Sequence, residues 1–161
     1  MKILSDQQIA ALIAEQKKIP SGLSPMGKMT ERCQHNRKDF EIQVDSGNQF
    51  VVRVRQSSLN PNDFSVILGY RIPSSYTVFR LRRYNGNSHQ HTNTLEKQTI
   101  DGFHVHEATE RYQRLGGAKE DHYAESTQRY YHLDSAIQCL LAECGFKSPL
   151  AESPLFMGET I

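Results

Sequence analysis

The stretch DFEIQVDSGNQFVVRVRQS, residues 39–57, decides the fold of this chain. Apolar and polar residues alternate on both sides of SGN, which is the pattern of two strands whose successive side chains point to opposite faces. The short turn with its glycine predicts that the two strands form an antiparallel hairpin. In the second arm, one face comprises Phe50, Val52 and Val54 and the other comprises Val51, Arg53 and Arg55. One apolar face and one arginine-bearing face are expected of an antiparallel sheet that helices cover on one side only.

Further strands are predicted after this hairpin. FSVILGYRI (64–72) and YTVFRLRRY (76–84) are joined by PSS, and NGNSHQHTNT (85–94) is a loop by composition. In the second of these strands, Phe79 and Leu81 face one way and Arg80, Arg82 and Tyr84 face the other. GFHVHEA (102–108) predicts one more short strand, with Phe103 and Val105 facing the core and His104 and His106 facing outward.

Helices are predicted at both ends of the strand region. Ser5 and Gln8 form the capping-box pattern in front of a helix over residues 6–17. A second helix is predicted over residues 133–146, with Asp134 as its cap and Gly145 as its stop. The connections between strands are too short for parallel crossovers. We therefore expect an α+β fold, an antiparallel sheet of four to five strands flanked by an N-terminal and a C-terminal helix, with residues 1–146 as one domain and 147–161 as a tail or arm.

Composition excludes several classes of protein. At 161 residues the chain is long enough for one self-sufficient core. Its apolar stretches are too short for a membrane span, and its N-terminus has no apolar segment of signal-peptide length. Three cysteines without a C-x-x-C pair argue against a disulfide framework and a zinc ribbon. We expect a cytoplasmic protein that needs no membrane and no bound cofactor.

Positive charge and histidine gather in the middle of the chain. Residues 51–92 hold six arginines and one acid, although the whole chain has a net charge of only +1. Four of the seven histidines lie at the end of this segment and just after it, as the pairs His89/His91 and His104/His106. Such a basic segment suits a phosphate-bearing or acidic partner. The alternative is a set of solvated arginines on an exposed sheet face.

Three interpretations of the histidine pairs stay open. A strand places His104 and His106 on one face, and a loop folded over that strand would bring His89 and His91 to the same point, where four imidazoles could bind zinc, copper or nickel. Alternatively, histidines could transfer protons in metal-free RNA cleavage while arginines hold the phosphate. The third interpretation is a polar loop without chemistry. The P-loop, the dinucleotide fingerprint and the H-E-x-x-H zinc motif are all missing from the sequence.

The segments RYNGNSHQH and GFHVH resemble the central motif of the TumE-type toxins of bacterial toxin–antitoxin systems, and YHLDSAIQCLLAECGF resembles their closing helix. The resemblance covers residues 79–146, and its matching positions are Arg83, Tyr84, Asn85, His89, Phe103, His104 and His106. The N-terminal helix and residues 55–73 are similar to a family of small uncharacterised proteins of bacteria and their phages. The resemblance implies a cytoplasmic protein that acts on RNA and is held in check by an antitoxin-type partner.

The leading hypothesis is a toxin-like protein that binds RNA or cleaves it without a metal. In this hypothesis the catalytic set is His89, His104, His106, Arg83 and Tyr84, and the nucleic-acid-binding set is Arg53, Arg55, Arg80 and Arg82. The first alternative is a non-enzymatic binding module, a phage or host-defence regulator whose arginine face meets an acidic protein surface. The second is a metal-dependent hydrolase with His89, His91, His104 and His106 as ligands.

Overall fold

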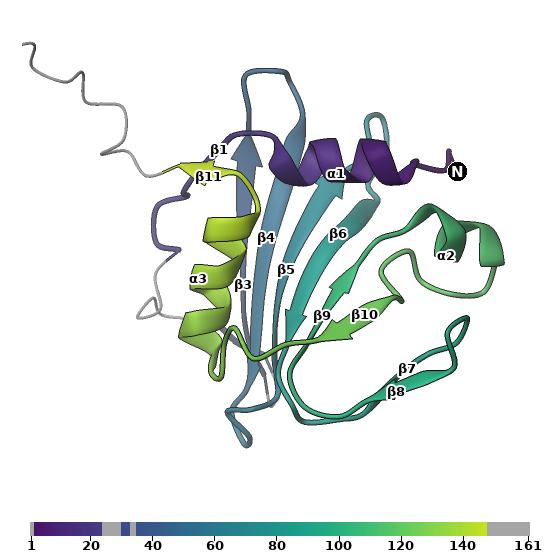
Figure 1. Cartoon of the computed structure of the whole chain (residues 1–161). Coiled ribbons are helices and arrows are strands. Elements are labelled where there is room, and N and C mark those ends of the chain that lie inside the picture. Colours follow the sequence, from purple (N-terminus) through teal and green to yellow (C-terminus); the bar gives the residue numbers. More distant parts are fainter. Residues whose placement is uncertain (1, 24–29, 33–34, 148–161) are drawn as a thin grey trace, which may run out of the picture.

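A seven-stranded antiparallel sheet forms the centre of the part of the chain that the computed structural model describes, residues 2–23, 30–32 and 35–147 (Figure 1). Its strands run in the order β10-β9-β6-β5-β4-β3-β2. Their bounds are β2 (Thr30–Arg32), β3 (His35–Gln43), β4 (Gln49–Ser57), β5 (Phe64–Arg71), β6 (Val78–Asn85), β9 (His104–Glu107) and β10 (Ala124–Ser126). The predicted α+β class with an antiparallel sheet is confirmed, and the short edge strands β2 and β10 extend the predicted sheet.

The hairpin predicted from residues 39–57 is confirmed, and the structure fixes its register. Phe40 pairs with Val52 and Ile42 with Phe50 across β3 and β4. Gly47 in the connecting turn has a φ of 91°, a left-handed conformation that glycine adopts without strain. Because register fixes which side chains face the core, these four paired residues share the core face, while Val51 is buried on the opposite face.

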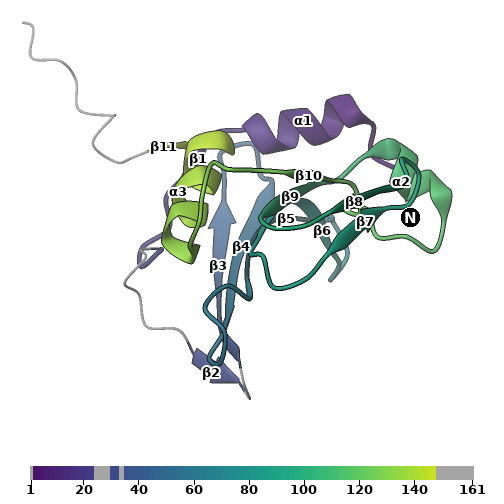
Figure 2. The ribbon, with the colours of Figure 1, turned by 60° about the horizontal axis from the view of Figure 1, so that its bottom comes forward.

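Smaller elements complete the described structure. They are α1 (Asp6–Ala14), β1 (Lys17–Lys18), β7 (His91–Asn93), β8 (Gln98–Ile100), α2 (Glu110–Leu115), α3 (Leu133–Glu143) and β11 (Phe146–Lys147). β1 and β11 pair in parallel, and β7 and β8 form a hairpin outside the main sheet. Figure 2 shows this hairpin together with α2 at the β9–β10 end of the molecule. Part of the segment predicted as a loop, residues 85–94, is therefore a strand.

The helix caps agree with prediction at α1 and differ at α3. Ser5 and Gln8 form the predicted capping box. At α3 the predicted cap Asp134 lies inside the first turn, and His132 is the N-cap, because its side chain accepts a hydrogen bond from the backbone of Ser135. Both helices are shorter than predicted, because Lys17 and Phe146 pair with each other as strand residues. The predicted tail from residue 148 onward lies outside the described residues.

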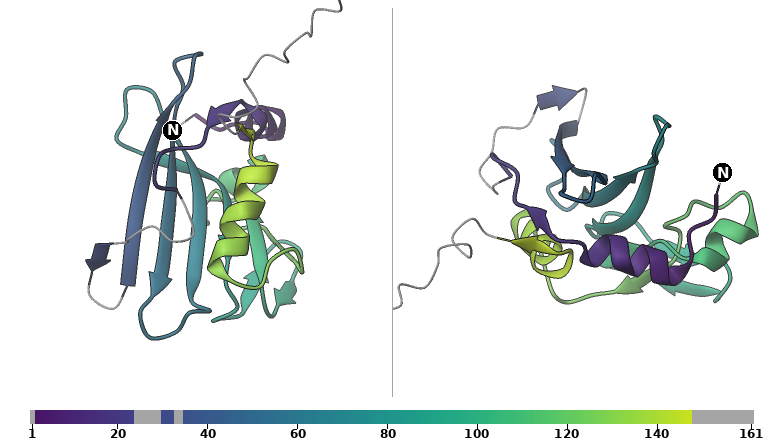
Figure 3. Two further views of the ribbon diagram at one scale, coloured as in Figure 1. Left: turned by 90° about the vertical axis from the view of Figure 1, so that its left-hand side faces the viewer. Right: turned by 90° about the horizontal axis from the view of Figure 1, so that it is seen from above.

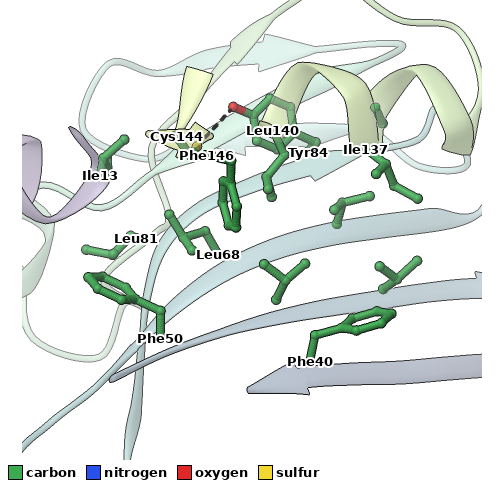
Figure 4. Packing of buried hydrophobic residues seen from close by; sticks show 14 of the residues in the cluster. Ile13, Phe40, Phe50, Leu68, Leu81, Tyr84, Ile137, Leu140, Cys144 and Phe146 are labelled. Atoms are coloured by element: carbon green, nitrogen blue, oxygen red, sulfur yellow. Dashed lines mark hydrogen bonds between the residues drawn. The ribbon is translucent and has the colours of Figure 1, made fainter. Parts of the chain in front are cut away.

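The core lies between the helices α1 and α3 and one face of the sheet (Figures 1 and 3). Figure 4 shows its centre, where Ile137 and Leu140 of α3 pack over the sheet residues Leu68 and Leu81. Cys144 is buried in the same cluster, where it packs as a core residue. No helix among the described residues is long and apolar enough to cross a membrane.

A β-bulge changes which residues of β6 face the core. The pairing register of β5 and β6 shifts between Leu68 and Gly69, where Leu81 is the extra residue of β6. Alternation resumes one residue later, so Tyr84 lies in the core with Phe79 and is fully buried. The prediction that Tyr84 faces away from Phe79 is therefore wrong.

Lys17 joins the C-terminal ends of α1 and α3. Its side chain is 1% exposed, and its Nζ lies 4.4 Å from the ring centre of Phe50. The ammonium group donates at 2.7–3.0 Å to the backbone carbonyls of Leu12, Ile13, Glu15 and Cys144. Burial lowers the pKa of Lys17 to about 8, against the attraction of Cys144 and Glu15. One cation thus satisfies carbonyl groups that the ends of both helices leave open.

Candidate functional site

An open cavity of about 720 Å³ lies beside β6 and β9, under β7 and the loop that follows α2. Its lining residues are Arg83, His89, His91, Thr94, His106, Leu115, Gly116, Gly117, Ala118, Lys119 and His122. We call it the histidine cavity, because four imidazoles line it together with two cationic side chains. The glycines 116 and 117 both have positive φ, so the loop makes a turn there that other residues would strain.

The two His-x-His pairs come together at this cavity. On β9, His104 lies opposite Asn85 and His106 opposite Arg83 of β6, so all four side chains share the sheet face that the helices leave open. His91 of β7 lies over them, with its ring centre 4.5 Å from that of His106 and 5.7 Å from that of His104. His104 and His106 face away from the core as predicted, but they are buried because β7 covers them.

His106 presents a neutral imidazole to the cavity. Its Nδ1 donates to the backbone carbonyl of Asp121 at 2.8 Å, which fixes the tautomer and leaves the lone pair on Nε2. The pKa of His106 is lowered to about 2, mainly by burial and also by the nearby Arg83, His91 and His104. Nε2 is buried and has no hydrogen-bond partner in the part of the chain that the structure describes. His106 therefore stays unprotonated near neutral pH.

His104 supports the cavity from behind. It is fully buried, its Nδ1 donates to the carbonyl of Gly102 at 2.8 Å, and its Nε2 lies 3.3 Å from the amide nitrogen of Asn85. The hydroxyl of Tyr130 donates to the backbone carbonyls of both Asn85 and His104. Burial lowers the pKa of His104 as well. Both ring nitrogens are occupied, so this histidine positions its neighbours and does not face a ligand.

His91 is held in place by the edge of the main sheet. Its Nε2 donates to the side-chain oxygen of Asn93 at 3.1 Å. Asn93 is itself fixed, because its amide nitrogen donates to the carbonyl of Ala124 at 2.8 Å and its oxygen accepts from the Ala124 amide at 2.9 Å. These bonds attach the β7–β8 hairpin to β10. Burial lowers the pKa of His91.

His122 completes the wall of the cavity. Its ring centre lies 4.9 Å from that of His91 and 5.2 Å from that of Tyr112, and its Nε2 donates to the carbonyl of Thr92 at 3.2 Å. His89 is exposed at the rim, where its Nδ1 lies 3.3 Å from the hydroxyl of Ser88. His91 and His122 are thus two neighbouring imidazoles on elements that pack against each other.

The cationic side of the cavity is built around a buried carboxylate. Asp121 is fully buried, and its two oxygens lie 3.0 Å from Nε of Arg83 and 3.4 Å from Nε of Arg80. Neither contact has hydrogen-bond geometry, so the two arginines hold the carboxylate by ion pairing alone. Arg80 also pairs with Glu120. Asp121 neutralises part of the charge of Arg83. Lys119 is the other cation of the lining, and it has no ion-pair partner among the described residues.

A sequence model of a family of unknown function (DUF6978) matches residues 4–144. The chain belongs to this family. No curated protein and no solved structure matches the chain. The DUF6978 match begins before α1 and ends after α3, so it includes the buried core except Phe146 and every residue of the histidine cavity.

Several predicted site residues of this DUF6978 chain lie away from the cavity. Tyr84 lies in the core, where its hydroxyl donates to Glu143 at 2.7 Å. Arg82 lies on the helix side of the sheet with Glu107, because the bulge in β6 reverses its facing. Neither residue is placed to act in the histidine cavity.

The remaining arginines are paired with carboxylates on the sheet face. Arg53 contacts Asp39 at 3.1 Å, and Arg55 contacts Asp63 at 2.7 Å. Both side chains are about one-third exposed, so solvent screens these ion pairs. Of the predicted arginines, only Arg83 lines the cavity.

Three polar cavity residues lie outside the predicted set: Thr94, Lys119 and His122. The sequence carries one signal for the last of them, because His122 follows the second histidine pair by only sixteen residues. Nothing in the pattern shows that the loop after α2 folds back over β9. In the described part of the chain, no three His, Cys, Asp or Glu side chains are arranged to hold a metal ion together.

Proposed function

We propose that the DUF6978 chain binds RNA in the histidine cavity and cleaves it by metal-independent acid/base chemistry. The observation that carries the proposal is the convergence of four histidines, Arg83 and Lys119 on one open cavity. Cleavage by the 2'-hydroxyl of RNA needs a base at that hydroxyl, an acid at the leaving 5'-oxygen and cations near the phosphate. Imidazole fills either proton-transfer role near neutral pH.

The geometry favours a division of roles within the cavity. His91 and His122, with ring centres 4.9 Å apart, are the pair proposed to move protons, and His89 stands beside them at the rim. In the reaction, one imidazole takes the proton of the 2'-hydroxyl as its oxygen attacks phosphorus. The other imidazole gives a proton to the 5'-oxygen as its bond to phosphorus breaks. Arg83 and Lys119 are proposed to hold the phosphate.

The resemblance to TumE-type toxins supports the same site. Of its matching positions, Arg83, His89 and His106 line the cavity, and Asn85 and His104 lie directly behind it. Tyr84 and Phe103 pack against or within the core instead. The proposal therefore keeps the toxin-like activity and the antitoxin-type partner that the resemblance implies, while it moves the proton-transfer roles to His91 and His122.

The test is incubation of the protein with a mixed RNA pool at low salt, where phosphate contacts are strongest, with and without EDTA. His91→Ala and His122→Ala should each lower the cleavage rate by roughly 100-fold or more, the usual effect of removing a general acid or base. The control for the histidine variants is His132→Asn, which changes a histidine outside the cavity and keeps a good helix cap at α3. Lys119→Ala tests the proposed phosphate contact, and Lys18→Ala, at an exposed lysine, is its control.

The outcomes of this experiment distinguish metal-independent cleavage, metal-dependent hydrolysis and RNA binding alone. Cleavage that survives EDTA and is lost in the cavity variants supports the proposal. Cleavage that EDTA abolishes favours a metal-dependent hydrolase. Tight RNA binding without cleavage restricts the function to binding, and absence of both binding and cleavage refutes the proposal.

A further inference from the structure

The unpartnered nitrogen of His106 is a feature that the proposed proton transfers do not use. The side chain of His106 is 2% exposed, and Nε2 has no hydrogen-bond partner among the described residues. Because a carbonyl oxygen only accepts, the bond to Asp121 places the proton on Nδ1 and leaves Nε2 as an acceptor. A buried acceptor without a donor is unfavourable, so polar ligand groups that donate a hydrogen bond gain by reaching it.

The neighbours of His106 keep it an acceptor. Arg83 from β6, His104 from its own strand and His91 from β7 face the ring, and all of them oppose a positive charge there. The loop after α2 contributes the Asp121 carbonyl, which occupies Nδ1. The hydrogen bond to Asp121 raises the pKa of His106, but burial and these three neighbours outweigh it, so Nε2 stays an acceptor near neutral pH.

We propose that Nε2 of His106 accepts a hydrogen bond from the ribose 2'-hydroxyl of a bound nucleotide other than the one whose 2'-hydroxyl attacks phosphorus, so that binding at His106 distinguishes RNA from DNA. The inference rests on the proposed function, and it names the sugar as the recognised group. Arg83 and Lys119 line the same cavity and are proposed to hold a phosphate. The group that donates a hydrogen bond to Nε2 would therefore lie next to that phosphate. In nucleic acids the hydroxyl in that place is the 2'-hydroxyl, which donates in RNA and is missing from DNA.

A pair of substitutions separates the acceptor from the packing role of the ring. The amide of asparagine reaches the position of Nδ1, so His106→Asn keeps the donor to Asp121 and removes the acceptor at Nε2. The amide of glutamine reaches the position of Nε2, so His106→Gln keeps an acceptor there. Both variants are neutral, as the native ring is, and both are made in a His122→Ala background so that RNA survives the binding measurement.

The experiment measures dissociation constants of three oligonucleotides with one base sequence: RNA, 2'-fluoro RNA and DNA. The 2'-fluoro strand keeps a ribose-like sugar but has no hydroxyl to donate. With His106 present, RNA is expected to bind roughly three- to tenfold more tightly than the other two strands, the worth of one neutral hydrogen bond. The preference should vanish in His106→Asn and persist in His106→Gln.

The outcomes distinguish this inference from the function on which it rests. Equal binding of all three strands to the protein with His106, or an RNA preference that survives in His106→Asn, overturns the inference and leaves nucleic-acid binding intact. Failure to bind any of the strands refutes the proposed function and the inference together. If His106→Asn does not fold, equal binding of RNA and 2'-fluoro RNA to the protein with His106 still overturns the inference.

Discussion

Lys17 makes the stability of this protein rise with pH above neutrality. Its pKa is about 8 in the folded chain, compared with 10.5 for a free lysine. Between these two values the unfolded chain holds a proton that the folded chain has released, so raising the pH favours the folded state. The shift corresponds to a gain of about 2 kcal/mol in the free energy of unfolding between about pH 8 and pH 10.

The assay is urea unfolding of the wild type and of Lys17→Met at a series of pH values between 7 and 10. Other groups titrate in both proteins, so the difference between the two free energies of unfolding isolates Lys17. Lys17→Met should be less stable at every pH, because four backbone carbonyls lose their donor, and the deficit should widen by about 2 kcal/mol as the pH rises. Lys18→Met, which changes the exposed neighbour, should show no such trend. A deficit that stays constant with pH would refute the reasoning.

Three further predictions concern the support of the fold and of the cavity. Asp121→Asn leaves Arg83 without its counter-ion and should lower the free energy of unfolding by about 3 kcal/mol, measured by urea titration. Gly145→Ala should destabilise the protein by several kcal/mol, because its φ is 77° and the added Cβ would lie 2.5 Å from a carbonyl oxygen; Gly47→Ala, at a φ of 91° with open space, should cost only about 1 kcal/mol. Tyr130→Phe removes a donor shared by two backbone carbonyls and should cost about 1–2 kcal/mol in thermal unfolding, whereas an unchanged melting temperature would show that the hydroxyl contributes nothing.

The central hairpin was predictable because its information is local. In β3 and β4, the alternation of apolar and polar residues and the short turn between them determine the element type, the pairing register and the sheet face of each side chain. Phe50 and Val52 therefore lie on the core side, as expected. The facing of Tyr84 was not predictable in this way. The bulge that reverses it depends on the pairing of β6 with Gly69 on another strand, where a Cβ would lie 2.4 Å from Val78.

For the histidine cavity, some of the lining residues could be predicted from the sequence, but the contacts that bring them together could not. The spacing in His104 and His106 places both side chains on one face of a strand, and this inference depends on strand geometry alone. The position of His91 over them depends on Asn93, whose partner Ala124 lies thirty-one residues further along the chain. His122 joins for the same reason, since long-range contacts place the loop that carries it. Such contacts leave no periodic trace in a sequence.

Because the β7–β8 hairpin is attached to β10, the histidine cavity can form only after β10 has been synthesised. The two His-x-His pairs are synthesised by residue 106, but the Asp121 carbonyl, the backbone of Ala124 and the Tyr130 hydroxyl that fix them come later. A nascent chain that ends before these residues has all the imidazoles of both pairs and no cavity to hold them. If the cavity cleaves RNA as proposed, incomplete chains on the ribosome would therefore lack the assembled site.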